Sequence, residues 1–333
     1  MTEQSIASAP GKVVLSGAYA VLSGAPAICM AVDRRAVASV EETGDDHHVV
    51  VAPGHIEEPQ RFRVRDGVFA WLDSGSDFGL LEQVWRASNI SREGGLSLRL
   101  DTTAFFDAEQ GGKIGIGSSA ALTVALASVL TGLAPGRVDP VAVAHEGHLG
   151  FQGGLGSGVD IATSAAGGLV EYRMQERAAS KLTMPAGLEC RFLWSGAPAS
   201  TGKKLQHLSS RGPQPSLDAL VVSAKRVASA WESGSAEAVL SEYREYIEAL
   251  QQFSTDHDLG VFDAGHSELA AMAAHAGLVY KPCGAGGGDV GVLLADNAER
   301  ADEFIAANLP GGFRELDLQV DEIGAQRTEV SSE

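Results

Sequence analysis

The ten residues Gly112–Ala121 read Gly-Lys-Ile-Gly-Ile-Gly-Ser-Ser-Ala-Ala and lead directly into the apolar segment Leu122–Leu133. This order predicts a tight glycine turn followed by a buried helix that begins at Ser118 or Ser119. The first turn of a helix has N–H groups without intrahelical partners and the positive end of the dipole, so such a turn can bind phosphate. The two hydroxyls add donors for the anion and oxygen ligands for a cation such as Mg²⁺. Nucleotide binding is therefore the first hypothesis.

Other interpretations compete for this loop. Gly115–Ala120 fits the dinucleotide fingerprint G-x-G-x-x-A, but that fingerprint follows a hydrophobic strand and precedes an acidic residue at the end of a second strand. The polar residues 107–113 and the position of Asp139 before Pro140, where it fits a helix cap, provide neither. A Walker A pattern is also absent, because Gly196–Lys204 has one residue too many before its Gly-Lys pair. A glycine-rich helix start that binds nothing stays open on this loop alone.

Length and composition favour a cytoplasmic, globular protein. The 333 residues allow two hydrophobic cores, at roughly 100 to 200 residues per domain. A formal net charge of −18 argues against a nucleic-acid-binding surface, which needs Lys and Arg opposite phosphates. The three widely spaced cysteines predict no disulfide framework, so we expect a reducing compartment. No stretch has the length and apolarity of a membrane span, and residues 1–10 lack the pattern of a signal peptide.

Hydropathy patterns predict strands and helices in both halves of the chain, and hence an α+β fold. Short apolar or alternating runs predict strands at 13–15, 27–32, 35–41, 62–65, 96–100, 169–172, 190–194 and 290–294. Helical spacing predicts helices at 78–87, 120–133, 140–151, 267–276 and 297–309, and a helix-rich block at 217–254. The polar segment 174–187 marks the expected boundary between an N-terminal domain, residues 1–180, and a C-terminal domain, residues 181–333.

A lysine near the N-terminus is the first candidate catalytic residue. Lys12 follows Pro10 and Gly11 at the start of an apolar run. A lone lysine is usually a solvated surface charge. One that is fixed at a strand edge beside two small residues can instead reach a cleft, where a compact cation stabilises developing negative charge.

Two further glycine runs each lie next to an aspartate. Gly153–Gly158 precedes Asp160, whose carboxylate either satisfies a helix dipole or orients, and deprotonates, a substrate hydroxyl during phosphoryl transfer. Gly284–Gly288 precedes Asp289 and a strand. Its three consecutive glycines predict a nest of N–H groups that binds an anion. The alternative for this run is a flexible hairpin connection.

In this order, the segments resemble the GHMP small-molecule kinase superfamily. Pro10–Lys12 resembles its first motif, Gly115–Ala121 its second and Gly284–Asp289 its third. Within the superfamily the chain is most similar to phosphomevalonate kinases, over nearly its whole length. The segments that carry this similarity are Gln152–Ala162, Trp194–Thr201, Lys281–Gly291, in which Cys283 replaces a serine, and Leu316–Gly324.

The resemblance implies a fold and a reaction. The fold would be the two-domain GHMP kinase fold, with an ATP-binding N-terminal domain like domain 2 of ribosomal protein S5 and a ferredoxin-like C-terminal domain. The reaction would transfer the γ-phosphoryl group of ATP to 5-phosphomevalonate, giving 5-diphosphomevalonate for isoprenoid synthesis, with Mg²⁺ as the metal. The partner would be a small phosphorylated hydroxy acid, with no nucleic acid and no membrane, and the chain would be a homodimer or a monomer.

The resemblance also implies roles for matching residues. Lys12 and Asp160 would be catalytic. Because an ionised phosphate acceptor leaves a base little to remove, Lys12 would draw the two anions together and Asp160 would orient. The ATP phosphates would be bound by Lys113, Gly115, Gly117, Ser118, Ser119 and Ala120, with Ser118 reaching Mg²⁺. The substrate would be bound by Ser16, Tyr19, Ser157, Gly158, Ser200, Thr201, Lys281, Gly286, Gly287 and Asp289.

One departure from the family pattern keeps rival functions open. Mevalonate kinases have a metal-binding glutamate eleven residues before the aspartate, where this chain has Leu149. A second metal ligand is therefore unassigned, as is an adenine pocket in the region of Trp71 and Trp85. The rivals are another GHMP-type enzyme, such as a mevalonate kinase or a mevalonate phosphate decarboxylase, and a sensor without activity. Retention of both Lys12 and Asp160 speaks against the sensor.

Overall fold

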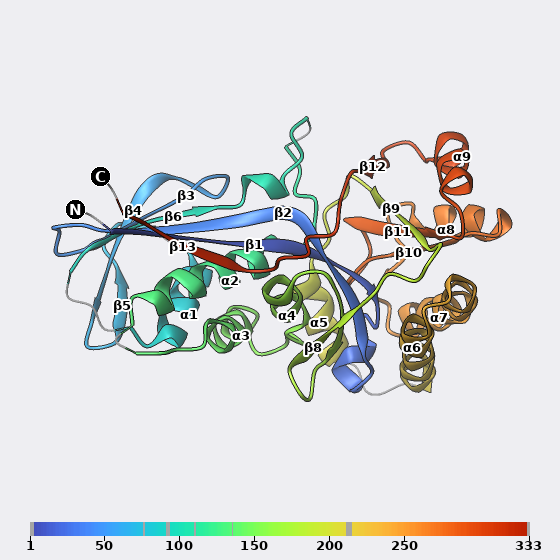
Figure 1. Ribbon diagram of the computed structural model, residues 1–333, viewed down its shortest axis with the longest axis horizontal. Helices are drawn as coiled ribbons and strands as arrows, with labels where there is room; N and C mark the ends of the chain where they lie inside the picture. Colours follow the sequence, from blue (N-terminus) through green and yellow to red (C-terminus); the bar gives the residue numbers. More distant parts are fainter. Residues whose placement is uncertain are drawn as a thin grey trace.

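The computed structural model describes residues 3–75, 77–90, 94–109, 111–134, 136–210 and 215–331. The chain forms one sheet of nine strands and one of four, with helices packed against them (Figure 1). This arrangement confirms the predicted α+β class. In the ranges given, no helix has both the length and the apolarity that a membrane crossing requires.

The nine-stranded sheet is built around two long strands, β1 (Glu3–Ser16) and β2 (Ala27–Glu42) (Figure 1). Its other strands are β3 (His48–Ala52), β4 (Ile56–Arg65), β5 (Val68–Trp71), β6 (Leu96–Asp101), β7 (Leu169–Arg173), β8 (Ala178–Leu182) and β13 (Gln326–Ser331). The strand order is β13-β1-β2-β6-β3-β4-β5, while β7 pairs with both β2 and β8. β3 runs parallel to β6, and the other described pairs are antiparallel.

The pairing of β1 with β2 is irregular next to the predicted catalytic lysine. The two strands expected at 27–32 and 35–41 are the single strand β2. Its partners shift from Pro10–Arg35 to Gly11–Val32, so two residues of β2 are left over at this point. Irregularities of this kind bend a strand and re-aim the side chains beside them. Lys12 is the next residue of β1.

Four helices cover one face of the large sheet: α1 (Gly79–Ser88), α2 (Ser118–Gly132), α3 (Pro140–Phe151) and α4 (Val159–Ala166) (Figure 1). Two 3₁₀ turns, η1 (Ala20–Ser23) and η2 (Thr103–Phe105), lie in the connections. α2 is the central helix and is apolar on every side, so every residue from Ala120 to Thr131 is buried. α3 begins as predicted, because Asp139 accepts a hydrogen bond from Val141 N at 2.9 Å and Pro140 occupies the first turn.

The second sheet has the order β10 (Val279–Pro282), β11 (Val290–Ala295), β9 (Glu189–Trp194) and β12 (Arg314–Leu316), with antiparallel neighbours. The helices that accompany it are α5 (Thr201–Ser209), α6 (Pro215–Ser233), α7 (Ala236–Asp256), α8 (His266–His275) and α9 (Ala298–Asn308). The predicted helix-rich block is the packed pair α6 and α7.

The two halves of the chain share the large sheet. The predicted boundary after residue 180 falls inside β8, which pairs with β7. Strand β13, from the end of the chain, pairs with β1. Buried residues from both sheets form one hydrophobic cluster. The division into domains 1–180 and 181–333 stays a prediction, and the C-terminal half returns a strand to the first sheet.

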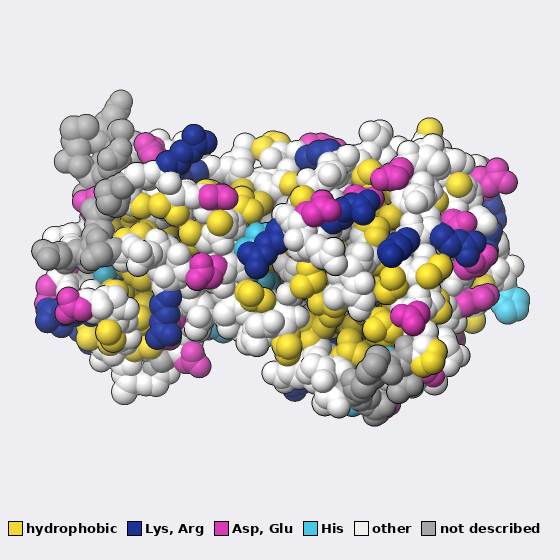
Figure 2. All heavy atoms as spheres, turned by 90° about the horizontal axis from the view of Figure 1, so that it is seen from below, with side chains coloured by type: hydrophobic (Ala, Val, Ile, Leu, Met, Phe, Trp, Pro, Cys, Tyr) yellow, Lys and Arg dark blue, Asp and Glu magenta, His cyan; other side chains and the backbone are white. Residues whose placement is uncertain are grey.

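The surface in Figure 2 mixes charges of both signs. On this face the Lys and Arg side chains are separated from one another by acidic, hydrophobic and other groups. The described part of this face therefore has no continuous basic stripe.

Candidate active site

The serine loop, residues 112–118, has the geometry of an anion site. α2 begins at Ser118, as predicted, and Gly117 in front of it has φ +81° with no side-chain cap. Gly115 is also left-handed, with φ +88°. Because no side chain caps α2, the N–H groups of its first turn have no side-chain partner. The loop thus combines free donors with the positive end of a helix dipole.

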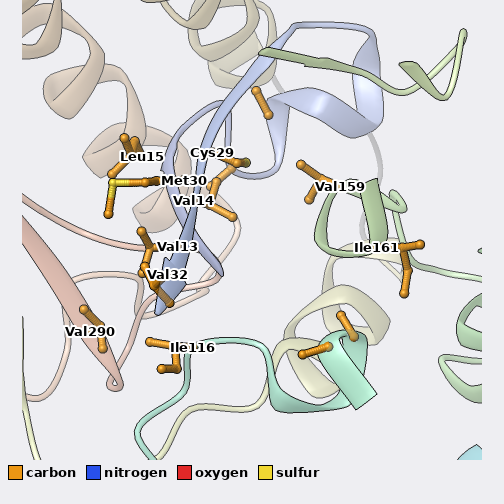
Figure 3. Close-up of a cluster of buried hydrophobic side chains, with 14 of the residues drawn as sticks. Val13, Val14, Leu15, Cys29, Met30, Val32, Ile116, Val159, Ile161 and Val290 are labelled. Carbon is orange, nitrogen blue, oxygen red and sulfur yellow. The ribbon is translucent and has the colours of Figure 1, made fainter. Parts of the chain in front are cut away.

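Strand β1 anchors the serine loop. The Lys12 N–H donates a hydrogen bond to Ile116 O at 2.8 Å. Gly11 permits this approach, since a Cβ at that position would lie 2.7 Å from the same oxygen. Figure 3 shows the Ile116 side chain in a cluster of buried side chains from β1, β2, α4 and β11, including Val290. The loop is therefore fixed to both sheets through one buried residue.

Lys12 and Asp160, the predicted catalytic pair, lie together beside this loop. Lys12 Nζ is 3.2 Å from Asp160 Oδ1, and the two side chains are 11% and 24% exposed. The Lys12 stem crosses Gly117, where a Cβ would lie 2.9 Å from Lys12 Cε. Burial lowers the pKa of Lys12, but neighbouring groups, chiefly the Asp160 carboxylate, raise it by more, and the net shift is upward. A charged lysine therefore lies at the start of α2.

Helix α4 positions Asp160. Gly158 precedes the helix with φ +79°, and Asp160 lies in the first turn. The Ser157 hydroxyl accepts a hydrogen bond from Val159 N at 3.3 Å, and Tyr172 OH donates to Ser157 O at 2.8 Å. Ser157 and Gly158 therefore shape the turn that aims the carboxylate at Lys12.

His148 is a candidate site residue that the sequence reasoning missed. Its Nε2 lies 3.3 Å from Ser119 Oγ, and the side chain is buried. Burial lowers the pKa of His148 to about 4, against the opposing charge of Asp160, so the imidazole is neutral near pH 7. A signal was present in the sequence, because His145 and His148 lie three residues apart on one face of the predicted helix.

Asp289 closes the opposite side of the serine loop. It has φ +55°, and its Oδ1 accepts a hydrogen bond from Ala199 N at 3.1 Å. Its side chain lies so close to Gly115 that a Cβ there would collide with the carboxyl group. Burial raises the pKa of Asp289, opposed by the Ala199 N–H and by neighbouring lysine charges. The structure thus brings Asp289 to the loop, as predicted.

Of the three consecutive glycines before Asp289, two do not offer the free N–H groups that the predicted nest requires. Gly286 N donates to Cys283 O at 3.3 Å, and Gly287 N donates to Val261 O at 2.7 Å. A Cβ on Gly286 would collide with Val261 O. These glycines permit close packing between chain segments, and their donors are used inside the protein.

Four predicted substrate residues line a common pocket: Tyr19, Ser157, Gly158 and Thr201. Tyr19 OH donates to Ala285 O at 2.7 Å and so links the end of β1 to the third glycine run, residues 284–288. Ser200 caps α5 through a hydrogen bond from Lys203 N, and Thr201 is the first residue of that helix.

Two other predicted substrate residues lie away from the pocket surface. Ser16 and Lys281 are fully buried. Lys281 Nζ donates to Val14 O at 3.4 Å, and burial lowers its pKa. Neither side chain lines the pocket that contains Lys12, so their assignment as substrate contacts has no support from this geometry.

The pocket, called here the acceptor pocket, combines one charged end with apolar walls. Lys12, Asp160, His148 and Thr201 lie on its polar side. Its apolar lining comprises Val14, Ala18, Val21, Leu22, Ala27 and Leu205. Among the described residues that line it, Lys12 is the one Lys or Arg. Such a pocket suits a small ligand that has an apolar body and a polar end facing the lysine and the carboxylate.

Of the two tryptophans in the region expected for adenine, Trp85 belongs to the core and the half-buried Trp71 packs against it. Trp85 is buried and its ring packs edge-on against Phe62 at 5.2 Å between centroids. Trp71 meets Phe62 in the same way at 5.6 Å. These ring contacts stabilise the edge of the large sheet that contains β4 and β5. Packing alone therefore accounts for both tryptophans.

Comparisons with known proteins give relatives of similar length. No family model matches the chain. It is 28% identical to a phosphomevalonate kinase from Streptomyces sp. over 86% of this chain and 89% of that protein. It is 27% identical to a mevalonate kinase from Pyrococcus abyssi over 92% and 93%. The fold matches Streptococcus pneumoniae phosphomevalonate kinase in complex with phosphomevalonate and AMPPNP, with a TM-score of 0.75, 20% identity and 95% and 99% coverage.

Fold, site and relatives together define the class of protein. The chain is a small-molecule kinase, and its sequence and fold are similar to those of GHMP-type kinases, as its motifs indicated. Within that class it is a kinase of the mevalonate-pathway type, since both relatives above are kinases of this kind. Phosphomevalonate kinase is the name shared by the Streptomyces relative and the solved structure.

Proposed function

We propose that the chain transfers the γ-phosphoryl group of ATP to the phosphate of 5-phosphomevalonate, giving ADP and 5-diphosphomevalonate. The observation that carries this proposal is the Lys12–Asp160 pair, at 3.2 Å, in a pocket next to the start of α2. The solved phosphomevalonate kinase of the same fold binds phosphomevalonate and AMPPNP, which supports the choice of both substrates.

The serine loop fits the phosphates of a nucleotide. The first-turn N–H groups of α2, together with Ser118, Ser119 and the exposed Lys113, would bind them. In the described part of the chain, no three His, Cys, Asp or Glu side chains are grouped to hold a metal. Mg²⁺ would therefore be held by the Ser118 hydroxyl together with phosphate oxygens, and it would supply charge screening at the transferred group.

Lys12 has the larger catalytic role in this proposal. An oxygen of the acceptor phosphate forms the new bond to the γ-phosphorus, and the bond to the ADP oxygen breaks. Lys12 offsets the repulsion between these two anions and holds them close together. The acceptor is already ionised, so no proton has to be removed, and Asp160 keeps the lysine charged and aimed.

The other predicted residues would act around this pair. Gly115, Gly117 and Ala120 would give the phosphates close backbone access. Tyr19, Ser157, Gly158, Ser200, Thr201 and Asp289 would enclose the acceptor. Ser16, Lys281, Gly286 and Gly287 would support the pocket from within the protein.

Mevalonate is the second candidate acceptor. The acceptor pocket has a single Lys or Arg among its described lining residues, which suits an acceptor that brings a hydroxyl instead of a second phosphate to Lys12. The Pyrococcus abyssi relative is a mevalonate kinase. In that reaction Asp160 would take the proton of the hydroxyl as it attacks.

A coupled assay for ADP tests these alternatives. ATP is offered in parallel with 5-phosphomevalonate, mevalonate and homoserine. We expect ADP release with 5-phosphomevalonate. Release with mevalonate and not with its phosphate would establish the second candidate, and ATP binding without turnover on any acceptor would favour a sensor.

A further inference from the structure

A second pocket lies beside the acceptor pocket, on the other side of the glycine turn Gly153–Gly158. Helix α3 contributes His145, the residue after the helix is Gln152, and the turn between β7 and β8 contributes Gln175 and Arg177. We call it the arginine pocket. The two pockets share His148, Gln152 and the residues 156–158. In Figure 1 the elements concerned, α3, α4 and β8, lie near one another, below the long strands β1 and β2.

The two pockets also approach each other at their rims. Gln175 Nε2 lies 3.3 Å from the position of a Cβ on Gly24, in the turn that follows Leu22 of the acceptor pocket. Between them, Gln152 packs on Gly156, where a Cβ would collide with its side-chain oxygen. The shared wall thus consists of His148, the amide of Gln152 and the small residues 156–158, and it is lowest where these small residues lie.

The arginine pocket holds donors that the protein itself does not use. Arg177 has φ +48°, and its backbone N–H donates to Met174 O at 3.2 Å. Within the described residues, its guanidinium makes no hydrogen bond or ion pair. His145 is 8% exposed, and its Nε2 is buried without a partner. Burial, and then the charge of Arg177, lowers the pKa of His145, so the ring is neutral near pH 7. A neutral imidazole offers one N–H, and a buried polar atom without a partner is costly.

The charges of this pocket favour an anion. No Asp or Glu is among its described lining residues, although the chain has 43 acidic and 25 basic residues. The acceptor pocket offers only Lys12, which is already paired with Asp160. A substrate with negative charge at both ends therefore meets one cation in each pocket.

We propose that the arginine pocket binds the carboxylate of the acceptor, with Arg177 as its cation and His145 Nε2 as a further donor. The reacting end of the same molecule then lies at Lys12, and its carbon chain crosses the wall at Gly156. This inference rests on the proposed function and specifies its substrate class: a hydroxy acid, or its phosphate, that is held at both ends. Arg177 is accordingly a specificity-determining residue, because it distinguishes an acid from a neutral analogue.

Equilibrium binding of two ligands to three proteins tests this. The ligands are 5-phosphomevalonate and its carboxyl methyl ester, which has lost the charge of the carboxylate. The proteins are the wild type, Arg177→Ala and the control Arg173→Ala, which removes an arginine paired with Glu171 outside both pockets. We expect the acid to bind Arg177→Ala about tenfold more weakly than it binds the wild type or the control. The ester should bind all three proteins equally weakly, and Arg177→Lys should recover part of the binding of the acid.

The results that overturn the inference differ from those that overturn the proposed function. Equal binding of the acid to the wild type and Arg177→Ala, or an equal loss for acid and ester, shows that Arg177 does not contact the carboxylate. If the acid binds through Arg177 and the wild type releases no ADP with it, the subsite stands and the proposed acceptor is wrong. If the wild type and Arg177→Ala turn over 5-phosphomevalonate with the same kcat/KM, the proposed function is supported and the proposed carboxylate site is wrong.

Discussion

The serine loop and the third glycine run look alike in sequence and behave differently in the structure. Both are glycine-rich. Gly117 of the serine loop lies against the Lys12 side chain, and the charge of Lys12 acts on Asp289, which follows the third run. The serine loop ends at the start of α2, where N–H groups stay without side-chain partners. In the third run, two N–H groups donate to Val261 O and Cys283 O. The residue that follows the run, Asp289, is held in one backbone conformation, with φ +55°. Glycine content therefore marks close approach, and the element that follows decides whether donors are left for a ligand.

The reason lies in how helices and strands use their donors. A helix leaves its first N–H groups unpaired, whereas a strand continues pairing up to the turn. The third run connects β10 with β11, which are antiparallel neighbours, and Cys283 N donates to Val290 O at 2.8 Å across this hairpin. The hairpin interpretation left open for this run was therefore right about its topology. Changes at the serine loop should alter rate, and changes at the third run should alter stability.

The largest effect is expected from Lys12→Met. This change removes the charge beside the serine loop and keeps a similar stem on Gly117. We expect kcat to fall by at least about 10², the scale for losing a charge that acts on the transition state. The KM for ATP should stay nearly constant, because the N-terminus of α2 is unchanged. Steady-state kinetics with the best acceptor measures both.

Lys225→Met, on the exposed side of α6, is the matched control and should leave kcat unchanged. Thermal unfolding shows whether the Lys12 variant is folded. A kcat within about threefold of the wild type would remove Lys12 from the transition state and place the reacting charge elsewhere.

At the third run, the expected large effect is a dependence of stability on pH. His266 is fully buried, with Nδ1 2.7 Å from Tyr280 OH and Nε2 3.1 Å from Gly288 O. Burial lowers the pKa of His266 to about 4, from about 6.5 in the unfolded chain. Folding therefore favours the neutral ring. The contribution of His266 to the unfolding free energy is complete above pH 6.5, and it is lost as the pH falls from there through 4. The loss between pH 7 and pH 4 should be about 3 kcal/mol.

Urea unfolding at a series of pH values measures this dependence. His266→Gln cannot take up the proton, so the difference in unfolding free energy between wild type and variant should shrink by about 3 kcal/mol on going from pH 7 to pH 4. His275→Gln, which removes an exposed histidine of the same helix, is the control and should keep the wild-type dependence. A constant difference for His266→Gln would mean that the third run does not hold this ring neutral.

Two alanine substitutions compare the glycine runs directly. Gly117 and Gly286 both have positive φ, +81° and +66°. A Cβ on Gly117 meets the movable Lys12 stem, whereas a Cβ on Gly286 meets the fixed Val261 O. Gly286→Ala should therefore lower the unfolding free energy by at least about 1 kcal/mol more than Gly117→Ala does. Gly117→Ala should lower kcat/KM for ATP about tenfold, by displacing Lys12 and the first N–H groups of α2.

Gly67→Ala is the control for backbone strain alone, since Gly67 has φ +73° and open space around its Cβ position. Its expected cost is about 1 kcal/mol. If Gly117→Ala and Gly286→Ala change kcat/KM equally while their stabilities match that of Gly67→Ala, the two runs do not differ in function.

Much of the fold could be read from local patterns in the sequence. α2 was predictable because a long apolar run follows glycines, and α3 because Asp139 and Pro140 mark its start. Strand β13 was missed, since its place is set by pairing with β1 at the other end of the chain. α5 was missed for another reason: none of its residues is fully buried, and its apolar side consists of two partly buried leucines, Leu205 and Leu208, which give only a short pattern.

The candidate site was predictable where motifs carry it. Lys12 and Asp160 were candidates because each follows glycines, the resemblance to kinases implied that they act together, and the structure places them 3.2 Å apart. His148 and Arg177 belong to no such motif. Their relation to Ser119 and to the glycine turn exists only once α3 and the β7–β8 turn have packed together. A sequence pattern records local order, and these contacts come from tertiary structure.

The smallest expected effect concerns the hydrogen bond that joins β1 to the third run. Tyr19→Phe removes the bond from Tyr19 OH to Ala285 O and keeps the ring against Phe253, at 5.5 Å between centroids. The unfolding free energy should fall by about 1 kcal/mol, the net value of one such bond. The KM for the acceptor should rise by at most about threefold, since the Ala199 N–H still holds the Asp289 carboxylate. Urea unfolding and steady-state kinetics check both values. A loss of kcat as large as that of Lys12→Met would show that the third run takes part in the reaction itself, and its difference from the serine loop would then be one of geometry alone.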